Sequence, residues 1–313
     1  MTDETGYVDR RTVLTAVPVS LGGVAGCSTV RSQGTVDFVS LLAAGSLAVA
    51  FNEQVGPAFE DATGIGYRGE FHGSNAVMRM VLDDQARPDV VVSADASLLR
   101  AKLEPTVIRW DVVFASNEVG IAYDPETEVG SRLDGTEPWY DVLRSTDASV
   151  ARSDPDLDPL GYRTVQLFEL AESYYDELGL TDALRSELVI DPGEAHLLAA
   201  VETGDRAAAV VYRNMAVDHD LPYQSLPAAL NFSDPALADH YASVTYTTEQ
   251  GTTLDGTPVL YNVTVPRAAP NPAAGRSFVE FLLSRPALLR ENGLVVTDAF
   301  PRRHGDVPAE VMP

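Results

Sequence analysis

Apolar and polar positions along this chain show two different periodicities, one typical of strands and one of helices, and the chain changes repeatedly from one to the other. Short runs rich in β-branched residues, such as Val90-Val91-Val92, predict buried strands, and longer stretches with apolar residues three or four apart predict helices. The predicted strands are 35–44, 67–71, 89–93, 117–123, 207–212 and 259–265. The predicted helices are 47–62 (with a break near 56–57), 75–84, 96–103, 164–178, 182–188, 194–202 and 276–289. Strands that alternate with helices favour a parallel sheet with helices on both faces.

This alternation occurs in two blocks, and 313 residues are enough for two domains. Residues 35–120 together with 262–313 form a predicted lobe I, and residues 121–261 form a predicted lobe II. The predicted strands 117–123 and 259–265 cross between the lobes. We therefore expect an α/β fold in which each lobe holds a mainly parallel sheet flanked by helices, with a cleft between the two.

The first 27 residues have the order of an export signal. Paired arginines, Arg10-Arg11, precede an apolar run too short to span a bilayer, and small residues follow up to the chain's single cysteine, Cys27. The arginine pair indicates the twin-arginine route, and Leu21–Cys27 resembles a lipobox whose cysteine receives a lipid. Residues 28–34 form a polar linker behind it. We expect a protein anchored to the outer face of the cytoplasmic membrane. A buried helix with a chance cysteine is the less favoured interpretation, because glycines weaken helices.

Charge narrows the choice of partners. Acidic residues outnumber basic ones by 46 to 22, the net charge is −24, and Lys102 is the only lysine. The acidic residues are scattered, so the charge belongs to a folded surface rather than to a disordered tail. A surface of this kind suits a protein of a halophilic archaeon, because concentrated salt screens the self-repulsion. Nucleic-acid binding is disfavoured, since no basic patch would neutralise phosphates. One cysteine also excludes an intrachain disulfide.

Two predicted strand-to-helix junctions carry similar short motifs, Ala44-Gly45-Ser46 and His72-Gly73-Ser74. Each places a serine hydroxyl and backbone N–H groups at a helix N-terminus, where the helix dipole favours anions. Either junction alone is ordinary helix capping. Two of them in one predicted lobe favour a shared anion site.

Several segments in sequence order resemble the archaeal tungstate/molybdate-binding proteins of ABC importers. They are 44–47, 73–77, 88–95, 153–163, 202–204, 211–216 and 258–266, and the similarity extends over residues 36–301. The most distinctive is Asp158-Pro159-Leu160-Gly161-Tyr162-Arg163. The resemblance implies a two-lobed periplasmic-binding-protein type II fold that closes on an oxyanion. It also implies a monomer without cofactor or enzymatic activity, which delivers tungstate or molybdate to an ABC permease with a cytoplasmic ATPase.

The resemblance also assigns roles to residues of the site. Ser46 and Ser74 would donate hydrogen bonds to the oxyanion from one lobe, and Tyr212 would donate from the other. Asp158 and Glu194 match two carboxylates that approach the metal atom of the bound oxyanion. Arg163 is expected only to support the Asp158 loop.

Two carboxylates beside a dianion would repel it in a purely electrostatic site. They are useful only if each oxygen becomes a ligand of a hard metal atom that accepts further bonds, as tungsten(VI) and molybdenum(VI) do. The sulfur of sulfate cannot expand in this way, so the same carboxylates would reject sulfate and phosphate.

Other interpretations stay open for the same residues. Without the resemblance, Asp158-Pro159 is a plain turn, Glu194 an ordinary first-turn acid, and Tyr212 an aromatic at the edge of the core. The main alternative function is a receptor for sulfate or phosphate, with neutral donors only. Asn231-Phe232-Ser233 and Asn262-Val263-Thr264 also fit the short glycosylation pattern.

An exported serine hydrolase is a further alternative with less support. The pattern Gly-x-Ser-x-Gly is absent, and none of the five histidines has a triad context, although His72 lies beside Ser74. No cluster of histidines and cysteines has transition-metal spacing, which disfavours a carrier of metal cations.

Overall fold

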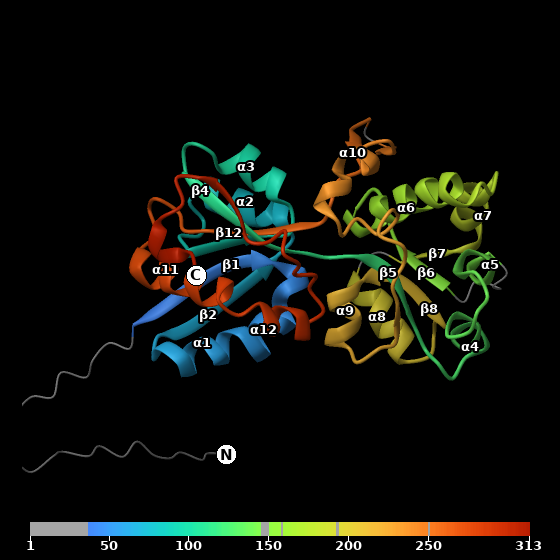
Figure 1. Ribbon diagram of the computed structural model, residues 1–313, viewed down its shortest axis with the longest axis horizontal. Coiled ribbons are helices and arrows are strands. Elements are labelled where there is room, and N and C mark those ends of the chain that lie inside the picture. Colours follow the sequence, from blue (N-terminus) through green and yellow to red (C-terminus); the bar gives the residue numbers. More distant parts are fainter. Residues whose placement is uncertain (1–36, 145–149, 158, 192–193, 250) are drawn as a thin grey trace, which may run out of the picture. The chain divides into compact units, whose positions relative to one another are not determined.

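The computed structural model describes residues 37–144, 150–157, 159–191, 194–249 and 251–313, and shows two α/β lobes built around two sheets (Figure 1). The predicted export signal 1–27, its lipid-bearing Cys27, the linker 28–34 and the candidate ligand Asp158 lie outside the described residues. Among the described residues, no helix is both long enough and apolar enough to cross a membrane.

The first lobe holds a six-stranded sheet in the order β13-β4-β12-β3-β1-β2. Its strands are β1 (Phe38–Ala44), β2 (Gly66–His72), β3 (Val90–Ser93), β4 (Trp110–Ser116), β12 (Leu260–Thr264) and β13 (Arg302–Gly305). Its helices are η1 (Gly45–Leu47), η2 (Ala50–Val55), α1 (Gly56–Thr63), α2 (Ser74–Leu82), α3 (Ala96–Leu103), α11 (Pro272–Leu283), α12 (Pro286–Glu291) and η4 (Ala309–Val311). Strand β1 pairs in parallel with β2 and β3, whereas β12 and β13 are antiparallel to their neighbours.

The second lobe holds a five-stranded sheet in the order β7-β6-β8-β5-β9. Its strands are β5 (Val119–Tyr123), β6 (Val150–Ser153), β7 (Val189–Asp191), β8 (Ala208–Tyr212) and β9 (Tyr223–Gln224). Its helices are α4 (Glu128–Leu133), α5 (Trp139–Leu143), α6 (Pro159–Tyr175), α7 (Leu180–Glu187), α8 (Glu194–Glu202) and α9 (Arg213–Asp218). A further segment holds η3 (Pro235–Leu237), α10 (Ala238–Tyr241) and the hairpin β10 (Thr245–Thr247) with β11 (Thr253–Asp255).

The chain crosses from one sheet to the other between β4 and β5, and it returns before β12. The two crossings lie side by side, because the Asn117 N–H donates to the Val259 carbonyl at 3.0 Å and the Val119 N–H donates to the Asn231 carbonyl at 2.9 Å. The predicted α/β fold with two crossing segments is confirmed, while the predicted lobe ranges stay a prediction.

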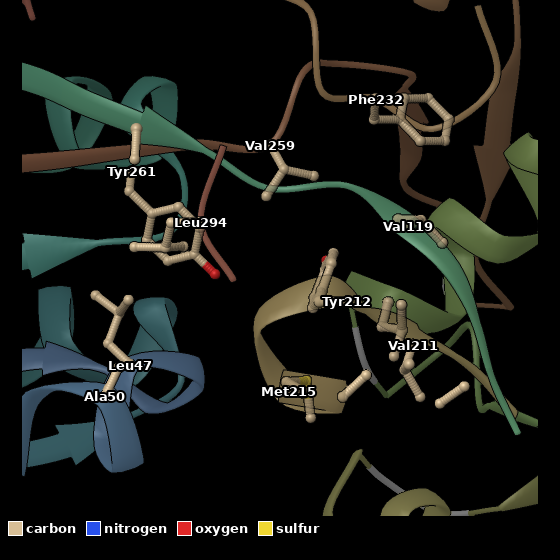
Figure 2. Close-up of a cluster of buried hydrophobic side chains, with 14 of the residues drawn as sticks. Leu47, Ala50, Val119, Val211, Tyr212, Met215, Phe232, Val259, Tyr261 and Leu294 are labelled. Carbon is tan, nitrogen blue, oxygen red and sulfur yellow. The ribbon is translucent and has the colours of Figure 1, made fainter. Parts of the chain in front are cut away.

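Buried apolar side chains form a continuous cluster that draws on both lobes. Figure 2 shows part of it, with Leu47 and Tyr261 from the first lobe and Tyr212 and Met215 from the second. Val119 and Val259, beside the two crossings, belong to this cluster, and Asn117 between them is fully buried.

Some predicted elements differ in detail from the structure. The predicted helix 276–289 is two helices, α11 and α12, because Pro286 cannot continue a helix but fits the first turn of a new one. The predicted helix 47–62 changes from 3-10 to π to α geometry without a break. Strand β4 was not predicted because the charged Asp111 lies within it; in the structure this buried carboxylate accepts from the Arg100 guanidinium at 2.8 Å.

Both glycosylation patterns fall on buried asparagines. Asn231 is 3% exposed and Asn262 0%. Their amide nitrogens donate to the carboxylates of Glu118 at 3.0 Å and Asp111 at 2.9 Å. The folded chain therefore presents neither side chain to a glycan.

A half-buried carboxyl on α9 predicts a dependence of stability on pH. Burial raises the pKa of Asp218 to about 7, Glu53 adds to this rise, and His219 opposes it. An unfolded aspartate titrates near pH 3.9, so the folded chain binds this proton more tightly. The stability that the group contributes is complete below about pH 4 and is lost as the pH rises to about 7. We expect Asp218→Asn to stabilise the protein by about 1 kcal/mol at pH 8 and to have little effect at pH 4. Thermal unfolding at both pH values measures this, and an equal shift at each would contradict it.

Candidate functional site

Parallel pairing brings the two Gly-Ser motifs together. Ala44 at the end of β1 is in register with His72 at the end of β2, so both strands finish at the same edge of the sheet. Ser46 follows in η1, and Ser74 is the first residue of α2. Both serines line one cavity of about 450 Å³. The carboxyl edge of such a sheet is where ligands bind in α/β proteins.

The second lobe completes this cavity in the same way. Strands β6 and β8 are parallel, and each leads at its carboxyl end into a helix, α6 and α9 respectively. Tyr212 is the last residue of β8 and lines the cavity together with Arg163 and Tyr162 of α6. The Arg163 guanidinium donates from Nη1 to the Tyr212 hydroxyl at 2.8 Å.

The structure thus brings Ser46, Ser74 and Tyr212 to one cavity. Asp158 lies outside the described residues, but its neighbours Leu157 and Pro159 both line this cavity. Glu194 begins helix α8, and its side chain also lies outside the described part of the chain.

The two serines are held by different partners. The Ser74 Oγ accepts the Ala94 N–H at 3.2 Å, so its own hydrogen can be donated elsewhere. The Ser46 Oγ forms a hydrogen bond of 2.8 Å with the Tyr261 hydroxyl. Donors of this kind, at the start of helical segments, suit an anion with several oxygen atoms.

Arg163 has a larger part in the site than the sequence predicted. It is only 3% exposed, and its Nε has no hydrogen-bond partner among the described residues. Burial lowers the pKa of its guanidinium, but Tyr162, Tyr212 and Asp95 together outweigh burial and raise the pKa above its usual value. The side chain is therefore a fixed cation on the cavity wall. An arginine at helical spacing from the apolar Leu160 and Leu167 was the signal in the sequence.

The first lobe adds two charged residues to the wall, Arg79 and Asp95. Arg79 on α2 is exposed, whereas Asp95 caps helix α3 by accepting the Leu98 N–H at 2.9 Å. The described lining residues thus carry two guanidinium groups and one carboxylate. In a chain of net charge −24, this local excess of positive charge favours an anionic ligand.

Gly161 allows α6 to begin where it does. A Cβ at this position would lie 2.3 Å from the Asp154 carbonyl oxygen, a distance at which backbone must move. We expect Gly161→Ala to destabilise the protein by about 2 kcal/mol, because it displaces the first turn of the helix that carries Arg163. Denaturant unfolding measures the loss, with Gly179→Ala as a control, where no atom lies within 4 Å and only the left-handed backbone is strained. A smaller loss for Gly161→Ala than for the control would contradict this account.

Residues 39–294 match a family described as bacterial extracellular solute-binding protein. The chain belongs to this family. An uncharacterized solute-binding protein of Halobacterium salinarum is 45% identical over 305 residues, which are 97% of either chain. The molybdate/tungstate-binding protein WtpA of Pyrococcus abyssi is 30% identical over 329 residues and 95% of either chain. The periplasmic molybdate-binding protein of Azotobacter vinelandii shares the fold, with a TM-score of 0.55 over 83% of this chain and all of its own, at 14% identity.

Membership in the solute-binding family settles the broad function. The protein is an extracellular solute-binding protein of ABC transport, and it binds its solute without a chemical reaction. A serine hydrolase is therefore excluded, although His72 and Ser74 lie on one turn. The predicted periplasmic-binding-protein fold is confirmed as well.

Proposed function

We propose that this solute-binding protein captures tungstate or molybdate in the cavity between its lobes and delivers it to an ABC permease. The observation that carries the proposal is the meeting of Ser46, Ser74, Tyr212 and Arg163 on one cavity wall. Three hydroxyl groups and a buried cation match a small tetrahedral dianion. The ligand named for the relative from Pyrococcus abyssi supports the choice.

The proposed metal ligands are Asp158 and Glu194, one oxygen each. Asp158 stands between two lining residues, Leu157 and Pro159, which is why we place its carboxylate at this cavity. Arg163 explains how two carboxylates and a dianion can share the site, because its fixed charge offsets part of their repulsion. Sulfate or phosphate would meet the same carboxylates without forming bonds to them.

Capture and delivery follow from the two-lobed build. Hinge motion at the two crossings would open and close the cavity, and the closed form would dock on the permease. We further propose that Cys27 carries a lipid after twin-arginine export. The ranges 35–120 with 262–313 and 121–261 are proposed to move as the two lobes. The acidic surface is proposed to keep the protein soluble in the concentrated salt of a halophile.

Calorimetric titration in molar salt tests the proposed ligand. Tungstate and molybdate should each bind one per chain with a Kd at or below about 1 μM, and sulfate and phosphate should show no heat of binding. Tight sulfate or phosphate binding would instead establish the main alternative, an oxyanion receptor with neutral donors.

A further inference from the structure

Three buried side chains close a ring of hydrogen bonds with Ser46. Asn214 of α9 donates from Nδ2 to the Ser46 carbonyl. Asn117, at the crossing after β4, donates from Nδ2 to the Asn214 Oδ1 at 2.6 Å and to the Tyr261 hydroxyl at 3.2 Å. The Tyr261 hydroxyl closes the ring with a hydrogen bond of 2.8 Å to the Ser46 Oγ. Asn117, Asn214 and Tyr261 are each 0% exposed.

A backbone group fixes the direction of this ring. The Glu118 N–H donates to the Asn117 Oδ1 at 2.9 Å, so the nitrogen of that amide must face Asn214 and Tyr261. The Tyr261 oxygen is then an acceptor from Asn117. A phenol, with a pKa near 10, is also a stronger donor than an alkyl hydroxyl, so Tyr261 donates to Ser46. Ser46 accepts within the ring and directs its own hydrogen out of it, towards the cavity that it lines.

We infer that Asn117 and Tyr261 are positioning residues that hold Ser46 as a hydrogen-bond donor towards the bound oxyanion. This inference rests on the proposed function, in which Ser46 contacts the ligand. A fully deprotonated oxyanion offers only acceptor oxygens, so a serine that presents its hydrogen binds it and a serine that presents lone pairs repels it. Hydrogen bonds that run in one direction also polarise one another, which strengthens the last donor.

The arrangement has a further consequence for closure. Ser46 belongs to the first lobe and Asn214 to the second, while Asn117 lies on the crossing between their sheets. The main chain and the side chain of Ser46 are thus both hydrogen-bonded to residues at the hinge. The Ser46 hydroxyl is therefore oriented as a donor when the two lobes are placed so that they form the cavity.

The test is sodium tungstate titration of the full chain by calorimetry in molar salt. Tyr261→Phe removes the donor to Ser46 without adding charge and should weaken binding about fivefold. In a Ser46→Ala background it should cause no further loss, because the residue through which it acts is absent. Tyr241→Phe is the matched control, since this equally buried tyrosine at the end of α10 hydrogen-bonds to the backbone of Ala228 and Asp234. It should bind tungstate like the parent.

Asn117→Asp reverses the ring at its origin. The new carboxylate still accepts the Glu118 N–H but turns Tyr261 towards itself, so that Ser46 presents lone pairs to the cavity. We expect a loss of about 50-fold, of which the part due to donor direction disappears in the Ser46→Ala background.

Thermal unfolding of each variant shows whether it is folded. If Asn117→Asp does not fold, the comparison of Tyr261→Phe with and without Ser46→Ala, which changes no charge, still tests the inference. If the parent binds tungstate and Tyr261→Phe binds it with the same affinity, the inference is overturned. Equal losses from Tyr261→Phe with and without Ser46 would overturn it too, because Tyr261 would then act through general structure. A parent that binds no tungstate would instead refute the proposed function.

Discussion

Replacing Arg163 by glutamine is expected to lower tungstate affinity about 100-fold, which is the loss of one buried, charge-assisted interaction. The guanidinium is 3% exposed, remains protonated, and faces the cavity beside Tyr212. Its charge acts at short range in a medium that screens poorly, so molar salt should reduce its effect far less than that of a surface charge. Glutamine keeps one donor for Tyr212 and removes the cation, which separates the effect of charge from that of orientation.

Arg79→Gln is the matched control for this experiment. Arg79 lines the same cavity but is exposed, so water and salt screen its charge and its loss should change the affinity by no more than about threefold. Calorimetry of both variants measures the difference, and thermal unfolding confirms that each is folded. Equal losses at the two positions would show that the cavity senses only the total charge, contrary to our account.

Removing the proposed metal ligands should change selectivity as well as affinity. Asp158→Asn and Glu194→Gln are each expected to weaken tungstate and molybdate binding at least about 100-fold, because a neutral amide is a poor ligand for a hard metal centre. The same changes remove a negative charge that repels every dianion. Sulfate binding should therefore remain unchanged or become stronger. In either case the ratio of tungstate affinity to sulfate affinity should fall.

Two neighbouring acids serve as controls for this pair. Asp154→Asn changes the same acidic run at a residue whose carboxylate accepts the Asp156 N–H, and Glu202→Gln changes the far end of α8. Neither should alter tungstate affinity. Tungstate binding that survives both Asp158→Asn and Glu194→Gln would refute metal coordination, even if the oxyanion still bound in the cavity.

The fold could be predicted from the sequence because strands and helices differ clearly in the spacing of their apolar residues. Helix α3 was predicted with its observed bounds, Ala96–Leu103, since an N-capping aspartate and a Glu-Pro sequence mark its two ends. Strand β4 was missed because Asp111 lies within it, and the Arg100 guanidinium that pairs with this buried carboxylate is a contact that no local pattern reveals. The two Gly-Ser motifs could be predicted to share a site, because parallel strands end at one edge.

Other parts of the site depend on contacts that no local pattern encodes. Arg163 and Tyr212 are 49 positions apart, and Ser46 and Asn214 are 168 apart. A hydrogen-bonded ring across two crossings requires the packed lobes, and its members look in sequence like ordinary polar residues at strand ends. The resemblance to tungstate/molybdate-binding proteins therefore identified three hydroxyl groups that line one cavity, while the contacts of Arg163, Asn117 and Asn214 are visible only in the structure.

The most direct test of the central claim is crystallographic. Anomalous diffraction from crystals of the protein grown with sodium tungstate locates tungsten without reference to any assumed site. Our account predicts one tungsten atom per chain in the cavity, with its oxygen atoms within hydrogen-bond distance of Ser46, Ser74 and Tyr212 and with Asp158 and Glu194 bound to the metal. A tungsten atom elsewhere, or none in the cavity at saturating tungstate, would contradict it.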